Sequence, residues 1–146
     1  MAKRILVPLD RSAASETVLP IVADLARSAG STVRLLNVQP VPEAVVADYG
    51  RVVAYRDQEM ARFEAKGQMY LEGIEAALQG IPVERVVRFG APTEEILVEA
   101  DAWDAELIVM AARPTTWRTR LRGRDIGAEV SRRAAVPVLQ YQWRAR

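Results

Sequence analysis

The stretch from Lys3 to Gly30, KRILVPLDRSAASETVLPIVADLARSAG, decides the fold. Residues 3–9 form a short, nearly continuous apolar run, which is typical of a parallel strand covered on both faces. The residues that follow predict a helix with Ser12 as its N-cap and Gly30 at its end. Pro20 lies inside the helical pattern, so we expect a kink or a later helix start. A strand that passes directly into a helix is the repeating unit of α/β proteins.

Strands and helices keep alternating to the end of the chain. Further strands are predicted at 32–39, 83–89, 107–111 and 136–142, and further helices at about 60–80, 92–103 and 125–133. Only residues 41–56 show no clear period. Gly67 and Gly73 lie inside the helix at 60–80, where each costs about 1 kcal/mol relative to Ala, so packing has to hold this helix. The order predicts one doubly wound α/β domain over residues 1–146, with a mostly parallel sheet and helices on both faces.

The residue types that are missing exclude several kinds of chemistry. The chain has no Cys and no His, so disulfides, thiolate or imidazole metal sites, Cys nucleophiles and His-based triads are all excluded. We therefore expect no catalytic residue and no metal site. The apolar runs are far shorter than the ~20 residues that cross a bilayer, and the N-terminus lacks the pattern of a secretory signal. These features predict a cytoplasmic protein.

Charge is distributed unevenly along the chain. The net charge of +1 combines an acidic body with a basic C-terminal quarter, in which nine Arg residues after residue 112 face only two acidic residues. Five of these arginines lie between residues 113 and 124, directly after the strand at 107–111. They either pair internally or with solvent, or bind a nucleotide or another anion, or form a nucleic-acid surface. Trp117 is the only aromatic residue among them, which argues against single-stranded nucleic acid.

A ligand site is expected at one edge of the sheet. In an open doubly wound sheet, ligands bind beyond the carboxyl ends of the strands, where the chain order reverses. Asp10 is the first polar residue after the first strand, so it either contacts a ligand there or caps the first helix. The usual phosphate-binding fingerprints, G-x-x-x-x-G-K-[ST] and G-x-G-x-x-G, are both absent.

Three stretches, in this order and at these separations, resemble a universal stress protein domain. They are ILVPLDRSAASETVL, FGAPTEEILVEADAWDAELIVMA and SRRAAVPVL, and the resemblance covers nearly the whole chain. It implies a five-stranded parallel sheet of order 3-2-1-4-5, which is a Rossmann-like arrangement. It also implies a homodimer built through the last strand, Val136–Gln142, and adenine or ribose contacts at Asp10 and Val38 in members that bind nucleotides.

The phosphate loop departs from the family pattern at every marked position. Nucleotide-binding members carry G-x-x-G, nine residues, then G-[ST] after the fourth strand, and these places fall here at Ala111, Pro114, Arg124 and Asp125. Glycines let backbone N–H groups approach phosphate oxygens, whereas Pro114 has no N–H to donate. A carboxylate at Asp125 would cap the next helix and repel a phosphate.

The departure favours one function and leaves an alternative open. It predicts a stress-response binding or regulatory module without efficient ATP binding and without a resident cofactor. The alternative is a member that binds ATP or AMP and hydrolyses ATP slowly, with phosphates held by arginine side chains such as Arg113 and Arg124.

Overall fold

The computed structural model describes residues 2–42, 51–112 and 125–142, and for residues 51–56 it describes the backbone only. Within these ranges lie five strands, β1 Arg4–Pro8, β2 Thr32–Gln39, β3 Val83–Phe89, β4 Leu107–Ala112 and β5 Val138–Gln142. The helices are α1 Ala13–Glu16, α2 Leu19–Ala29, α3 Arg51–Glu75, α4 Pro92–Ala102 and α6 Ile126–Arg133, with a 3-10 turn at Ala76–Leu78.

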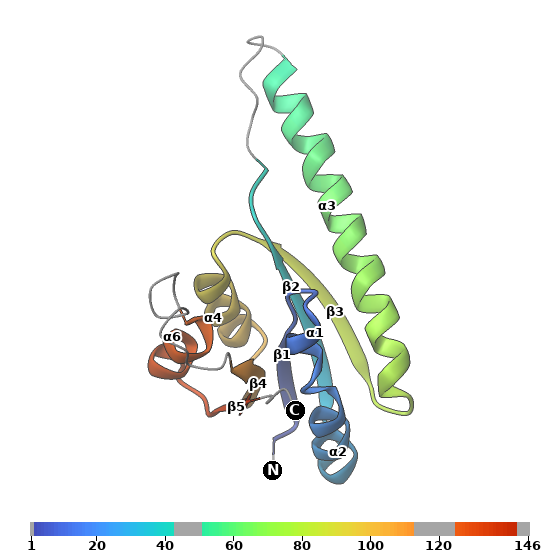
Figure 1. The fold of residues 1–146 in the computed structure, drawn as a ribbon, viewed down its shortest axis with the longest axis vertical. Helices are drawn as coiled ribbons and strands as arrows, with labels where there is room; N and C mark the ends of the chain where they lie inside the picture. The colour runs from blue at the N-terminus through green and yellow to red at the C-terminus, as the bar shows by residue number, and fades with distance from the viewer. Residues whose placement is uncertain (1, 43–50, 113–124, 143–146) are drawn as a thin grey trace.

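The strands form one parallel sheet of order β3-β2-β1-β4-β5 (Figure 1). This confirms the predicted order 3-2-1-4-5, with the first strand in the centre. β3 pairs with β2 alone and is an edge strand, where the alternating apolar and charged residues of VERVVRF suit one covered and one open face. The sheet therefore reverses its chain order between β1 and β4, where a ligand crevice is expected.

Helices cover both faces of the sheet, as predicted. Alternate side chains of β1 point to opposite faces: Ile5 and Val7 are buried under α2 and α3, whereas Leu6 is buried under α4 and α6. Because both faces are buried, the central strands consist of almost unbroken apolar residues.

The first predicted helix is divided into two. Ser12 caps α1, since its side chain accepts a hydrogen bond from the backbone N–H of Ser15 at 3.1 Å. Pro20 lies in the first turn of α2, where its missing N–H leaves no helical hydrogen bond unmade. Gly30 ends α2 with φ at 65°, in the left-handed region that a glycine enters without strain. The expected later helix start at Pro20 and the stop at Gly30 are thus both confirmed.

Helix α3 differs most from the prediction. It begins at Arg51 instead of near residue 60, and its α-helical part ends at Glu75. Figure 1 shows that its N-terminal part extends beyond the end of the sheet. Residues 41–56 show no clear helical period, so the pattern of the sequence did not reveal this start.

Two smaller differences concern the strands. The last strand begins at Val138, two residues later than predicted, and the first covers Arg4–Pro8 instead of residues 3–9. Before β5, the carbonyl of Pro137 accepts from the N–H of Ile108 at 3.0 Å, although the proline itself cannot donate to the sheet. Over the described ranges, no helix has the length and apolarity needed to cross a membrane.

Candidate ligand-binding crevice

A crevice of about 280 Å³ opens at the carboxyl ends of the central strands. Its walls come from the ends of β1, β2 and β4 and from the first turns of α1, α4 and α6. Cavities for small ligands have volumes of roughly 300–1,000 Å³, so this crevice suits a ligand at the small end of that range.

The predicted site residues that the structure describes lie together here. Asp10, Val38, Ala111 and Asp125 all line the crevice, although they come from four different elements or loops. Arg113, Pro114 and Arg124 lie outside the described residues.

Most of the wall was not singled out by the sequence. Residues from β1, β2, β4, α4, α6 and the loop before α1 complete it, and they include Pro8, Leu9, Ser12, Leu36, Pro92, Ile96, Met110 and Ile126. The signal that could have found some of them is their position, because residues at strand ends and in first helical turns share this edge of a parallel sheet.

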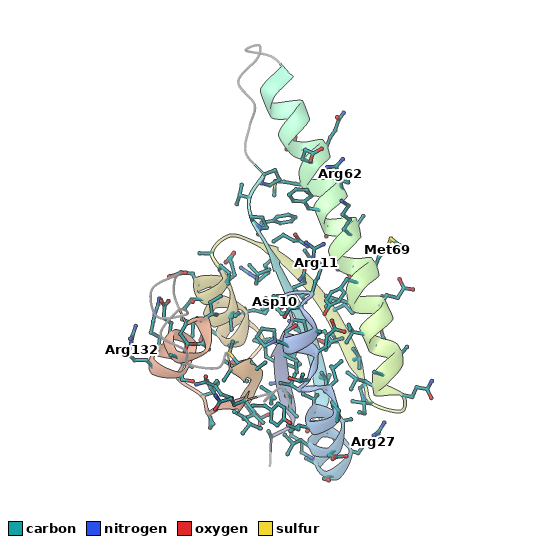
Figure 2. All side chains as sticks on the ribbon, in the orientation of Figure 1. Asp10, Arg11, Arg27, Arg62, Met69 and Arg132 are labelled. Carbon is teal, nitrogen blue, oxygen red and sulfur yellow. The ribbon has the colours of Figure 1, made fainter. Side chains whose placement is uncertain are left out.

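Asp10 does not cap α1 but binds Ser12, the residue that does. Its Oδ1 accepts from the backbone N–H of Ser12 at 2.9 Å and also from the Ser12 hydroxyl. Ser12 in turn caps α1, so the capping role that the sequence offered to Asp10 belongs to Ser12. Between them Arg11 has φ at 69°, a conformation that L side chains seldom adopt, so this turn is strained. Figure 2 places Asp10 and Arg11 at the end of the sheet from which α3 extends.

Asp125 caps α6, as the sequence predicted. Its carboxylate accepts from the backbone N–H of Ala128 at 3.1 Å. The positive end of the helix, which would otherwise attract an anion, is thus satisfied by a negative side chain of the chain itself. Among the described residues that line the crevice, the charged side chains are Asp10 and Asp125, and both are acidic.

Tyr70 of α3 places a buried hydroxyl group near Asp10 and Glu16, at the carboxyl end of β1 and in α1. Its geometry gives it no hydrogen bond with the described residues, although the side chains of Ser15 and Glu16 lie close enough to change its pKa. Burial raises the pKa of Tyr70 above its ordinary value, and the negative charges of Glu16 and Asp10 raise it further. The phenol therefore stays protonated near neutral pH.

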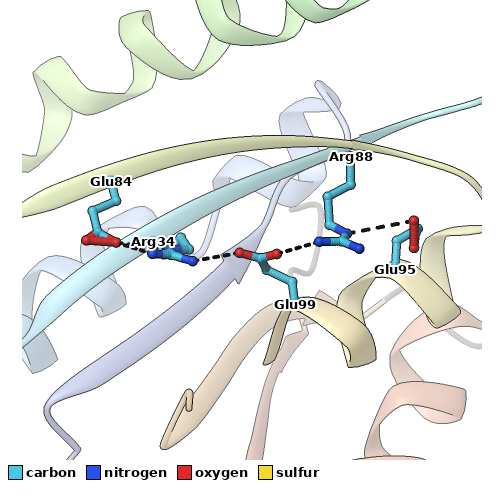
Figure 3. Close-up of polar contacts among 5 residues, drawn as sticks. All are labelled: Arg34, Glu84, Arg88, Glu95 and Glu99. Carbon is cyan, nitrogen blue, oxygen red and sulfur yellow. Dashed lines mark hydrogen bonds and ion pairs between the residues drawn. The ribbon is translucent and has the colours of Figure 1, made fainter. Parts of the chain in front are cut away.

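A separate ion network lies between the sheet and α4 (Figure 3). The Glu99 side chain is only 5% exposed and binds Arg34 at 2.7 Å and Arg88 at 2.9 Å. Arg34 also binds Glu84 and stacks over Trp103, 4.5 Å from the ring centroid. Sequence reasoning did not predict this network, since its charged side chains come from β2, β3 and α4, and Arg34 and Glu99 lie 65 residues apart in the chain.

The fold defines a class, the doubly wound α/β proteins with a parallel sheet, and the crevice lies at the switch point where such sheets bind ligands in general. Within that class the chain belongs to the universal stress protein family, because the profile of this family matches residues 1–141. The resemblance found in the sequence is therefore confirmed.

Several solved structures share this fold. The hypothetical protein MJ0577 is 23% identical with a TM-score of 0.80, and the match covers 99% of this chain and 98% of that one. A universal stress protein in complex with cAMP is 19% identical with a TM-score of 0.69, and 97% of each chain is covered. The universal stress protein of Archaeoglobus fulgidus in complex with dAMP is 21% identical with a TM-score of 0.59, covering 94% of this chain and 95% of that one. A comparison with curated proteins found no match.

Proposed function

We propose that this universal stress protein is a stress-response binding and regulatory module that does not bind ATP efficiently. It acts by binding and not by catalysis. The chain forms one domain of residues 1–146, and the protein is a homodimer in the cytoplasm. Its ligand site is the crevice lined by Asp10, Val38, Ala111 and Asp125.

The hydrogen bond from the Ala128 N–H to the Asp125 carboxylate carries this proposal. A triphosphate needs free backbone donors and the positive end of a helix. At α6 the Asp125 carboxylate already accepts a hydrogen bond from one of these donors, the Ala128 N–H. It also places a negative charge beside the remaining N–H groups of the first turn. A phosphate at the N-terminus of α6 would be repelled by the Asp125 carboxylate and would find fewer free N–H groups to bind.

Thermal unfolding with and without MgATP tests the proposal. A ligand that binds only the folded protein raises its melting temperature in proportion to the logarithm of ligand concentration over Kd. We expect no rise at millimolar MgATP. A clear rise under these conditions would contradict the proposal and favour an ATP-binding member of the family.

That second candidate is a protein that binds AMP or ATP through arginine side chains and hydrolyses ATP slowly. Two observations favour it: the apolar crevice is retained, and related structures contain cAMP or dAMP. The double variant Arg113→Ala, Arg124→Ala distinguishes it, because only under this candidate does the variant abolish a melting-temperature rise that wild-type protein shows with AMP or ATP.

The homodimer is proposed to form through the last strand, β5. This strand lies at the edge of the sheet and pairs with β4 alone, and its residues Leu139 and Tyr141 are 40% and 37% exposed. An edge strand with exposed apolar side chains is stabilised when another chain covers it.

A further inference from the structure

We propose that the outer edge of β3 binds an extended, basic segment of a partner protein as an added strand of the sheet. This edge is separate from the crevice, so binding there goes beyond the function proposed above. The backbone of β3 supplies the hydrogen bonds, and carboxylates of α3 select a partner with basic side chains.

Alternate residues of β3 direct their backbone groups away from β2. The N–H of Val33 donates to the carbonyl of Pro82, and the N–H of Gly90 donates to the carbonyl of Gln39, both at 2.9 Å. Because successive residues of a strand direct these groups to opposite sides, the even-numbered residues of β3 bond to β2 and the odd-numbered ones face outward. The outward residues are Val83, Arg85, Val87 and Phe89. β3 thus presents a row of donors and acceptors with which an added strand can pair.

The charged side chains of β3 are neutralised within the chain. Charges on an edge strand usually keep other strands away. In β3 each charged side chain instead binds an opposite charge nearby, and the pairs are Glu84–Arg34, Arg85–Glu75 and Arg88–Glu99. The strand itself therefore adds little net charge to its edge, and the charge of the neighbouring helix decides what can approach.

Helix α3 carries a stripe of acidic and amide side chains. Residues 64, 68, 72 and 75 are Glu, Gln, Glu and Glu, and they follow each other at helical spacing, so they share one side of the helix. Glu64 and Glu72 are exposed and form no ion pair with a described residue. This side of α3 is therefore negatively charged.

Two contacts show that the stripe faces the open edge of the sheet. Glu75, at its end, binds Arg85 of β3 at 3.2 Å. Tyr70 lies on the opposite flank of α3 and approaches Glu16 of α1, which packs over the centre of the sheet. The stripe thus points away from β1, toward the side of β3 on which no described strand lies (Figure 1).

The two sides of an added strand meet different surroundings. Its alternate side chains lie on the α3 face, where lysine or arginine side chains can reach Glu64 and Glu72. The remaining side chains lie on the face of Val86, which is partly buried against apolar neighbours. The segment that fits this edge therefore alternates basic and apolar residues.

Fluorescence anisotropy of labelled peptides with the full chain tests this fit. The probe alternates lysine and valine over seven residues, the length of β3. One control peptide carries glutamate in place of lysine, and a second has the composition of the probe with all lysines in one block. We expect the probe to bind at least about tenfold more tightly than either control. Its affinity should fall as ionic strength rises, because salt screens the attraction to the carboxylates.

The variant Arg85→Pro tests whether the backbone of β3 makes the contact. The N–H of Arg85 points outward, so a proline there removes a donor from the edge and leaves the bonds to β2 intact. Arg85→Ala is the matched control, since it loses the same side chain and keeps the N–H. We expect Arg85→Pro to weaken the probe at least about tenfold and Arg85→Ala to change it less than about twofold.

The variant Glu72→Gln tests the acidic stripe. Gln forms helices about as well as Glu, so α3 should keep its structure and lose one negative charge. Its control is Glu106→Gln, which removes the same charge at an exposed position just before β4, away from β3. We expect Glu72→Gln to weaken the probe about two- to fivefold and Glu106→Gln to leave its affinity unchanged.

Three results would overturn the inference. The first is a probe that binds no more tightly than the glutamate peptide, and the second is an equal loss of affinity in Arg85→Pro and Arg85→Ala. The third is an equal effect of Glu72→Gln and Glu106→Gln. If thermal unfolding shows that Arg85→Pro does not fold, a probe methylated at alternate backbone nitrogens replaces it, and undiminished binding of that probe would contradict strand addition.

Discussion

Single residues in this protein differ in what their surroundings allow, and two glycines of α3 illustrate it. Both Gly67 and Gly73 are weak helix formers, and from the sequence both required packing to hold the helix. Only Gly67 has that packing: a Cβ there would lie 2.7 Å from Val87 Cγ2 and 3.0 Å from Asn37 Oδ1. At Gly73 a Cβ would meet nothing within 4 Å. The sequence revealed the glycines but not which of them lets the helix approach β2 and β3.

Substituting each glycine by Ala should therefore have opposite effects. Gly73→Ala should raise the free energy of unfolding by about 0.5–1 kcal/mol, because Ala is the better helix former and finds open space. Gly67→Ala should lower it by about 1–2 kcal/mol, since the new methyl group pushes α3 away from Val87. Urea unfolding of both variants measures the difference, and a change in the same direction at both positions would contradict this account.

Tyr70 provides a pH-dependent prediction at the same scale. Tyr70→Phe removes a buried hydroxyl that makes no well-aligned hydrogen bond with its neighbours Ser15 and Glu16, so it should raise the free energy of unfolding by about 1 kcal/mol near neutral pH. Burial and the charge of Glu16 raise the pKa of Tyr70 in the folded state. The folded protein therefore holds the phenol proton more tightly than the unfolded chain does.

The sign of the pH effect follows from that difference. The stability linked to protonated Tyr70 is fully present below about pH 10, the unfolded pKa, and is lost as the pH rises toward the folded pKa. Wild-type protein should thus lose more stability than Tyr70→Phe above about pH 10. Urea unfolding at neutral and alkaline pH checks this, and equal losses in the two proteins would refute it.

Among the elements, the sequence predicted the helix ends that are set by neighbouring residues in the chain. Ser12, Pro20 and Gly30 mark helix ends through caps and backbone conformation, and the sequence revealed them. The start of α3 was missed because residues 41–56 show no clear helical period in the sequence, and its N-terminal part extends beyond the end of the sheet. The contacts that hold α4 against the sheet were missed as well, since Arg34 and Glu99 are 65 residues apart in the chain.

The ion network makes a prediction at this scale, because it joins α4 to β2 and β3. Glu99→Ala leaves two partly buried guanidinium groups without their shared partner and should lower the free energy of unfolding by about 3 kcal/mol. Glu84 binds the same Arg34 but its side chain is 45% exposed, so Glu84→Ala should lower it by less than about 1 kcal/mol. Chemical denaturation compares the two, and a similar loss for both would show that burial does not decide the effect.

For the whole molecule, the alternation of strands and helices predicted an α/β fold, and the family resemblance supplied the order of the strands. Both are confirmed by the sheet and by the family match. Of the crevice, the sequence predicted residues that directly follow strands, such as Asp10, and it predicted the Asp125 cap. It could not predict the walls from α4, because periodicity does not specify which helix covers which strand.

The edge strand β5 allows a test of assembly at this scale. If the chain is a homodimer through β5, light scattering after size-exclusion chromatography should give twice the chain mass, and Leu139→Lys should shift the protein to a monomer. Val98→Lys adds the same charge at an exposed apolar position of α4 and should leave the dimer intact. Equal behaviour of the two variants, or a monomeric wild-type protein, would rule out β5 as the interface.

Helix α4 takes part in both the crevice and the ion network. Ile96 lines the ligand cavity, and Glu99, one turn further along, binds the two arginines of the sheet. The width of the crevice and the geometry of the ion network therefore both depend on the position of α4. If a ligand in the crevice stabilises the position of α4, it also stabilises the ion network. By thermodynamic reciprocity, a substitution that breaks the network then lowers the affinity for that ligand by the same free energy.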